Sequence, residues 1–173
     1  MKALYSEDRI HNRVSEIARE ISRDFLGKDL VLIGILNGGF IFTADLCRSI
    51  AIPHEVDFLG ASSYGDSTVS SGNFTITKDL KKSVEKKSVI LVEDIVDTGK
   101  TLEFLYSLVE KHSPKEVKVA ALFWKQSKAN PKVPVHYPGF IIEDDFLVGY
   151  GLDYRGKYRN LPYVAKWESD SDT

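Results

Sequence analysis

The chain of 173 residues lacks several features that mark particular classes of protein. Cys47 is its only cysteine, so no internal disulfide can form and we expect a reducing, cytoplasmic location. No apolar run is long enough to cross a bilayer. The net charge of −2 provides no general attraction to nucleic acid or to an anionic membrane, so we predict neither as a partner. The four histidines show no metal-ligand spacing, which argues against a structural zinc site.

What remains is an ordinary globular composition, with 43% hydrophobic and 28% charged residues, in which strand and helix patterns alternate. Helical spacing of apolar residues predicts helices over 6–25, 40–51 and 100–112, and apolar runs predict strands over 30–36, 55–62, 89–92 and 116–124. This alternation predicts an α/β fold, a mostly parallel central sheet flanked by helices, in one domain over 1–173. After Lys125 the alternation ends. We interpret about 126–167, with the N-terminal segment, as a small hood subdomain, and 168–173 as a frayed acidic tail.

One segment carries most of the chemistry: residues 89–101 read Val-Ile-Leu-Val-Glu-Asp-Ile-Val-Asp-Thr-Gly-Lys-Thr. It predicts a buried strand that ends at the acidic pair Glu93 and Asp94, then a small-residue turn and a helix start, where free N–H groups favour a phosphate. Two carboxylates would repel a bare phosphate, so the ligand should also offer hydroxyls or Mg²⁺; a ribose 5′-phosphate satisfies both requirements. A nucleoside-triphosphate P-loop is excluded because Asp94 stands where that motif needs glycine. A plainer alternative is a buried strand capped by solvated acids.

This segment resembles the motif by which type I phosphoribosyltransferases bind phosphoribosyl pyrophosphate (PRPP). The resemblance implies that Glu93 and Asp94 hold the ribose and a magnesium ion. Asp97 is the candidate base or hydrogen-bond acceptor for the proton that leaves the purine. The resemblance also implies that PRPP is bound by Asp97, Thr98, Gly99, Lys100 and Thr101, with the 5′-phosphate held by the backbone and hydroxyls from Thr98 to Thr101.

The flanking sequence, from about residue 30 to 164, resembles the hypoxanthine-guanine phosphoribosyltransferases. Leu36-Asn37-Gly38-Gly39 is similar to the pyrophosphate loop of that family, which often carries a cis peptide, here expected between Leu36 and Asn37. The family commonly has lysine where this chain has Asn37. Ser63 and Tyr64 resemble the catalytic lid. Taken alone, these segments could also be a simple turn and an ordinary flexible loop.

Three further places resemble the base-binding part of the same family. Lys125 matches the lysine that donates to the purine 6-oxo group, although a lysine that ends a strand is usually a solvated charge. In the segment 145–154, Phe146 matches the aromatic that stacks on the purine, and the backbone of Leu147 matches the reader of its 2-position. The resemblance implies that Asp153 holds magnesium through water and helps to frame the base. It also implies that Arg159 contacts pyrophosphate. Without this context, Phe146 and Leu147 would be read as core residues.

The resemblance implies a purine salvage enzyme that transfers the phosphoribosyl group from PRPP to N9 of a 6-oxopurine, hypoxanthine and/or guanine, with Mg²⁺. The products would be IMP or GMP and pyrophosphate, and the enzyme is expected to be a homodimer or homotetramer. One alternative is a regulatory PRPP- or nucleotide-binding protein that represses transcription or binds RNA. Another is a transferase for xanthine or adenine.

Overall fold

The computed structural model describes residues 1–63, 74–128 and 132–167, and its centre is a six-stranded sheet. The order across this sheet is β4-β3-β2-β5-β6-β7. All neighbouring pairs are parallel except β3 and β4, which are antiparallel. The strands are β2 (Leu30–Leu36), β3 (Glu55–Ser63), β4 (Phe74–Lys78), β5 (Ser88–Val96), β6 (Glu116–Trp124) and β7 (Tyr137–Ile141). The mostly parallel α/β sheet predicted from the sequence is confirmed.

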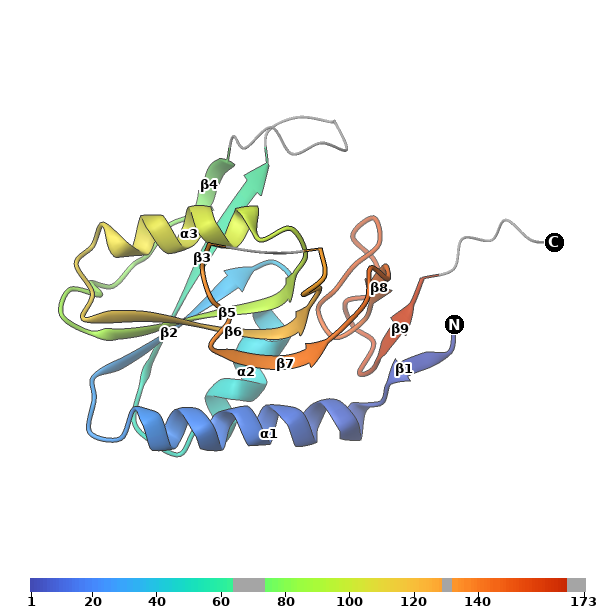
Figure 1. Cartoon of the computed structure of the whole chain (residues 1–173), viewed down its shortest axis with the longest axis horizontal. Helices are drawn as coiled ribbons and strands as arrows, with labels where there is room; N and C mark the ends of the chain where they lie inside the picture. The colour runs from blue at the N-terminus through green and yellow to red at the C-terminus, as the bar shows by residue number, and fades with distance from the viewer. Residues whose placement is uncertain (64–73, 129–131, 168–173) are drawn as a thin grey trace.

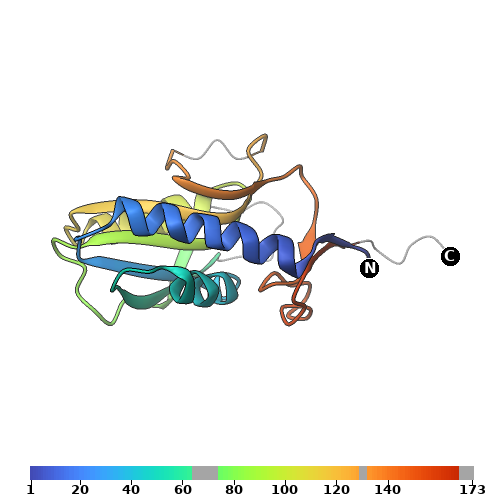
Figure 2. The same ribbon diagram turned by 90° about the horizontal axis from the view of Figure 1, so that it is seen from below.

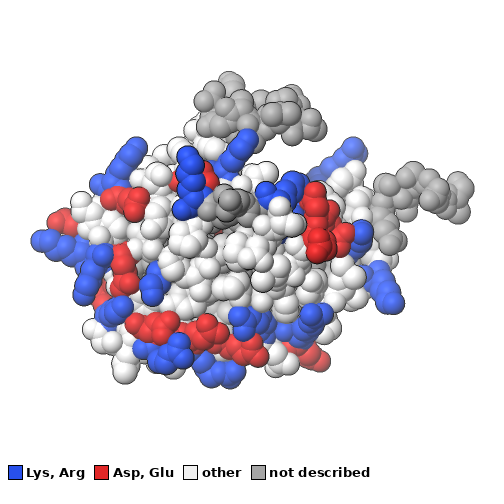
Figure 3. Space-filling model, in the orientation of Figure 1, with Lys and Arg blue, Asp and Glu red and all other residues white. Residues whose placement is uncertain are grey.

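Helices cover both faces of this sheet (Figures 1 and 2). α1 (Glu7–Asp24) and α2 (Phe40–Ser49) pack together on one face, and α3 (Lys100–Glu110) lies on the other. Ser6 caps α1, because its hydroxyl accepts a hydrogen bond from the Arg9 backbone N–H at 3.3 Å. Figure 3 shows acidic and basic side chains alternating along the outer surface of α1, where Arg13 pairs with Glu16 at 2.5 Å. Of the helices described, none is both long and apolar enough to span a membrane.

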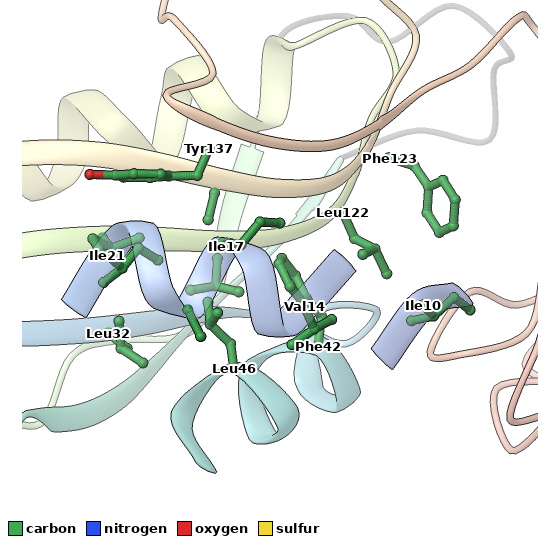
Figure 4. Packing of buried hydrophobic residues seen from close by; sticks show 14 of the residues in the cluster. Ile10, Val14, Ile17, Ile21, Leu32, Phe42, Leu46, Leu122, Phe123 and Tyr137 are labelled. Carbon is green, nitrogen blue, oxygen red and sulfur yellow. The ribbon is translucent and has the colours of Figure 1, made fainter. Parts of the chain in front are cut away.

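The core is divided by the sheet into two layers, as the alternation of side chains along a strand requires. On β5, Ile90 and Val92 face the layer under α1 and α2, whereas Val89 and Leu91 face the layer under α3. Figure 4 shows the first layer, in which side chains of α1 and α2 meet those of β2 and β6. Each fully buried Leu, Ile or Phe contributes about 1.5–3 kcal/mol by leaving water. The layers therefore hold β5 rigidly, and with it the acidic pair.

A second, three-stranded sheet forms a hood beyond the carboxyl ends of the parallel strands (Figure 1). It has the order β1-β9-β8 and consists of β1 (Ala3–Tyr5), β9 (Val164–Lys166) and β8 (Leu147–Val148). The N-terminal segment contributes β1 to this sheet. The expected start of the hood near residue 126 is wrong, because β7 pairs with β6 and belongs to the central sheet. Pro138 within β7 is tolerated because this strand lies at the edge of the sheet.

Candidate active site

The acidic pair lies inside a strand rather than after it. β5 continues to Val96, since Ile95 and Val96 go on pairing with β6, and the expectation that the strand ends at residue 92 is wrong. Both carboxylates are therefore enclosed: Glu93 and Asp94 are each only 8% exposed. Two adjacent buried acids form the floor of the site beneath the hood.

Burial dominates the electrostatics of this pair. It raises the pKa of the Glu93 carboxyl well above its ordinary value, and the neighbouring charge of Asp94 adds to the effect. Burial also raises the pKa of Asp94, against the opposing effects of its hydrogen bonds and of the positive charge of Arg159. One of these bonds is donated by the Ile95 backbone N–H to Oδ1 at 2.8 Å. A ligand that offers hydroxyls or a cation would compensate for this desolvation.

The end of β5 contributes residues to two cavities, one on each face of the strand. Glu93 lines one of about 90 Å³, and Asp94 lines the other, of about 220 Å³. Successive residues of a strand point to opposite faces, which explains why the two acids serve different cavities. Ile95 and Asp97 line both. A single ligand could therefore occupy both cavities by passing over these two residues.

The smaller cavity is formed by the turn after β5 and the first turn of α3. Gly99 adopts φ +83°, a conformation that other residues rarely tolerate, and α3 begins at the next residue. The first N–H groups of a helix have no partners within it, so this end suits an anion. Of the predicted phosphate-binding residues, Asp97, Thr98, Gly99 and Thr101 line the cavity. The Lys100 side chain is exposed and does not line it.

The predicted pyrophosphate loop packs directly on the acidic pair. The peptide bond between Leu36 and Asn37 is cis, as expected. A methyl group on Gly38 would lie 1.7 Å from Oδ2 of Asp94, and one on Gly151 would lie 2.2 Å from the Gly38 carbonyl oxygen. Only glycine permits this approach of loop, acid and hood.

Arg159 joins the same region from the hood. Its guanidinium donates to the Gly151 carbonyl oxygen at 2.5 Å and pairs with Oδ1 of Asp153 at 2.8 Å. Asp153 also accepts a hydrogen bond from the Gly156 backbone N–H at 2.7 Å, which orients its carboxylate. The structure therefore brings the two predicted residues of this loop together beside the acidic pair.

The larger cavity contains all four residues predicted to bind a purine. Lys125, Phe146, Leu147 and Asp153 line it together with Asp94 and Asp97. Phe146 is 52% exposed and lines the cavity, so its ring is accessible to a ligand there. Tyr154 supports its ring edge-on, with centroids 5.9 Å apart. This cavity has an aromatic face, a cation and carboxylates, the groups that a polar flat ring requires.

Similarity to known proteins agrees with this geometry. The model of the phosphoribosyl transferase domain family matches residues 1–155. The chain belongs to the phosphoribosyltransferase family. A hypoxanthine phosphoribosyltransferase of Salmonella typhimurium is 42% identical over 168 residues, which cover 96% of this chain and 94% of that protein.

Solved structures show the same fold. A hypoxanthine phosphoribosyltransferase from Staphylococcus aureus superposes with a TM-score of 0.93 at 38% identity, covering 96% of this chain and 91% of that one. A hypoxanthine-guanine phosphoribosyltransferase from Bacillus anthracis superposes with a TM-score of 0.92 at 42% identity, covering 97% and 99%. The central sheet with its hood is therefore the type I phosphoribosyltransferase fold.

The oxygen donors of this phosphoribosyltransferase suit a hard cation such as Mg²⁺. Glu93 and Asp94 supply buried carboxylates, and Asp153 lines the larger cavity together with Asp94. Across the described ranges, no three carboxylate, imidazole or thiol side chains lie close enough to hold a metal by themselves. A magnesium ion would therefore have to share its coordination with substrate oxygens and water, as is usual for Mg²⁺ bound with phosphates.

Sequence reasoning missed two charged residues that contact the predicted ones. Nζ of Lys125 lies 2.9 Å from Oδ1 of Asp144, and Nζ of Lys128 lies 3.0 Å from the same oxygen. Both lysines also reach Asp97, at 3.4 Å and 3.1 Å. Asp144 stands in the acidic run 143–145, which looks like a solvated turn, so nothing local in the sequence distinguishes it.

The structure places only one of the two predicted lid residues. Ser63, one of the two predicted lid residues, ends β3. Tyr64, the other, lies outside the described residues. A cavity of about 350 Å³ beside the hood is lined by Tyr5, Arg9 and Glu143, but it contains neither the acidic pair nor the helix start. Most of the predicted phosphate- and purine-binding residues line the two smaller cavities instead, which share Asp97.

Proposed function

We propose that this phosphoribosyltransferase is a purine salvage enzyme that transfers the 5-phosphoribosyl group of PRPP to N9 of a 6-oxopurine. The observation that carries the proposal is the pair of cavities joined at Asp97, one at a helix start and the other lined by Lys125 and Phe146. The names of the relatives support hypoxanthine as an acceptor. Use of guanine is supported by the name of the Bacillus anthracis relative and remains part of the proposal.

The substrate would lie across β5. Its 5′-phosphate would occupy the smaller cavity, held by backbone N–H groups and the hydroxyls of Thr98 and Thr101. The ribose diol would lie over Glu93 and Asp94, whose burial makes hydroxyl donors favourable partners. The diphosphate would extend toward the loop from Leu36 to Gly39 and toward Arg159.

The base would occupy the larger cavity. Nζ of Lys125 would donate to the 6-oxo group, which favours 6-oxopurines because the amino group of adenine cannot accept that bond. Phe146 would stack on the ring, and the backbone of Leu147 would meet its 2-position. Asp153, oriented by Arg159, would close the side of the cavity near the ribose.

The reaction would break the bond between the anomeric carbon and the pyrophosphate oxygen and form a bond from that carbon to N9. Asp97 lies between the two cavities and would take the proton that leaves the imidazole ring of the purine. Asn37, the backbone at Gly38 and Gly39, and the guanidinium of Arg159 would stabilise the departing pyrophosphate. Glu93, Asp94 and Asp153 would hold Mg²⁺, which when bound would supply positive charge to the diphosphate. The hood would keep water from the cation-like sugar.

Other features of the proposed enzyme come from the sequence and the family. The single cysteine supports a reducing cytoplasm, and the family resemblance supports a homodimer or homotetramer. Both remain predictions.

The test is a spectrophotometric assay of the purified protein with PRPP, Mg²⁺ and one base at a time: hypoxanthine, guanine, xanthine or adenine. We expect nucleotide formation from hypoxanthine, and Asp97→Asn serves as the low-activity control. Turnover of adenine alone would refute the role of Lys125 as a 6-oxo donor. Binding of PRPP without turnover of any of the four bases would refute the enzymatic proposal.

A further inference from the structure

Four charged side chains form a compact cluster, of which two line the larger cavity (Asp97 and Lys125) and two lie beside them (Lys128 and Asp144). Oδ1 of Asp144 lies between the two ammonium groups, 2.9 Å from Nζ of Lys125 and 3.0 Å from Nζ of Lys128. Asp97 contacts the same two lysines at longer distances, 3.4 Å and 3.1 Å. Positive and negative groups alternate around the cluster, so each lysine is shared by two acids.

Lys125 is the more buried of the two lysines, so its charge depends more strongly on a neighbouring anion. It is only 5% exposed, and a buried ammonium without a partner is strongly disfavoured. Asp97 cannot remain its main partner during the proposed reaction, because that carboxylate must receive a proton from the base. Asp144 is closer, and its side chain is 58% exposed on the rim, so an incoming base need not displace it.

We propose that Asp144 is a positioning residue, which holds the ammonium group of Lys125 at the base cavity and leaves Asp97 free for the purine. Asp144 would therefore determine recognition of the 6-oxo group without touching the base. The inference rests on the proposed contact of Lys125 with the purine.

The neighbouring acids do not share this role. Asp145 is committed to Lys166, with Oδ1 and Nζ 2.5 Å apart. Glu143 is exposed and makes no ion pair within the described part of the chain. Although three acids follow one another in the sequence, only Asp144 reaches Lys125. Glu143→Gln is therefore a matched control, since it removes one negative charge from the same turn.

The experiment compares steady-state kinetics of Asp144→Asn, Glu143→Gln, Lys128→Gln, Lys125→Gln and the double variant Asp144→Asn/Lys125→Gln. Loss of a charge-assisted hydrogen bond to a buried ammonium should raise the KM for hypoxanthine about tenfold in Asp144→Asn. The KM for PRPP should change less than about twofold, because the phosphate cavity is untouched. Preference for hypoxanthine over adenine should fall by a similar factor of about ten, an effect that general destabilisation would not produce.

The double variant decides whether Asp144 acts through Lys125. We expect Asp144→Asn to add nothing once Lys125 is glutamine, because its partner is then absent. Equal, additive effects in both backgrounds would overturn the inference. So would a Lys128→Gln variant that reproduces the loss completely, since Asp144 would then act through Lys128.

Two other outcomes separate the inference from the proposed function. If Lys125→Gln raises the KM for hypoxanthine while Asp144→Asn does not, the positioning role is refuted and the base site stands. If neither variant changes it, the purine contact of Lys125 fails, and the inference fails with it. Thermal melting of each variant checks folding; Asp144→Asn should melt at a lower temperature but stay folded, because Asp97 remains beside the buried Lys125 ammonium at 3.4 Å.

Discussion

Gly38→Ala is the change that most directly tests how the site is assembled. The added methyl group would lie 1.7 Å from Oδ2 and 2.5 Å from Cγ of Asp94, whereas real contacts of this kind essentially never fall below 3.0 Å. The Asp94 carboxylate or the loop would therefore have to move by at least the difference, 1.3 Å. The Asp94 carboxylate lines the larger cavity, so the added methyl group would push it into that cavity and away from the position in which it would meet the ribose.

The expected loss follows from that displacement. A misplacement of about 1 Å at a reacting centre costs on the order of 100-fold in rate, so kcat/KM for PRPP should fall by about that factor. This corresponds to about 2.7 kcal/mol of transition-state stabilisation. Initial rates of hypoxanthine conversion at varied PRPP measure it, and thermal melting records the accompanying change in stability.

Gly27→Ala is the control for that experiment. Gly27 adopts φ +76° with no atom within 4 Å of an added methyl group, so alanine there strains the backbone without touching the site. It should lower stability by about 1 kcal/mol and leave kcat/KM nearly unchanged. If Gly38→Ala keeps kcat/KM for PRPP within about fivefold of the parent value, the proposed packing of this loop on Asp94 does not govern catalysis.

Three further changes test other parts of the molecule. Asp97→Asn should lower kcat by about 10²–10⁴-fold while calorimetry shows PRPP affinity nearly unchanged; equal losses in both would remove the proton-acceptor role. Lys125→Ala should raise the KM for hypoxanthine about tenfold or more, and unchanged saturation curves would remove Lys125 from the base site. Asp57 is buried, which by itself would raise its pKa, but three backbone N–H groups (of Phe58, Lys81 and Lys82) hold the pKa of its carboxyl below the ordinary 3.8. Its stabilisation is therefore present above pH 3.8 and disappears as the pH falls through the lower, folded-state pKa. Asp57→Asn should thus cost about 1–3 kcal/mol in urea unfolding at neutral pH and less in acid; a cost independent of pH would contradict this account.

Local patterns predicted most of the central fold because they record burial directly. α1 shows apolar residues at helical spacing after a serine cap, and β2 and β6 are apolar runs, so their bounds agree with the structure to within a residue or two. β7 escaped this reasoning. Its sequence contains Pro138 and Gly139, and it is only half-buried at the sheet edge, so neither propensity nor periodicity marks it as part of the sheet.

Site residues could be predicted from the sequence where the local backbone conformation requires a particular residue type. Contacts between side chains that are distant in the sequence could not be predicted in this way. Gly38 and Gly99 are fixed by a close approach and by a positive φ, respectively, and such positions leave a mark in the sequence. Asp144 meets Lys125 across 19 residues of chain, from an exposed turn where any polar residue would be acceptable. Its contact depends on how the segment after β7 returns over the sheet, which no short motif encodes.

Burial of the acidic pair lowers the folding stability of the free protein and increases its affinity for a ligand that offers hydroxyls or a cation. Glu93 and Asp94 lose water without a cation partner close enough to prevent the rise in their pKa values. The flanking strands compensate, because β2 and β6 enclose the apolar run of Val89 to Val92 on both sides of β5. A ribose diol or a magnesium ion would remove part of the desolvation cost of the two carboxylates, and this gain would contribute to the affinity for PRPP. The buried acidic pair therefore lies on β5, where apolar packing on both faces of the strand stabilises the fold enough to offset the desolvation of the two carboxylates.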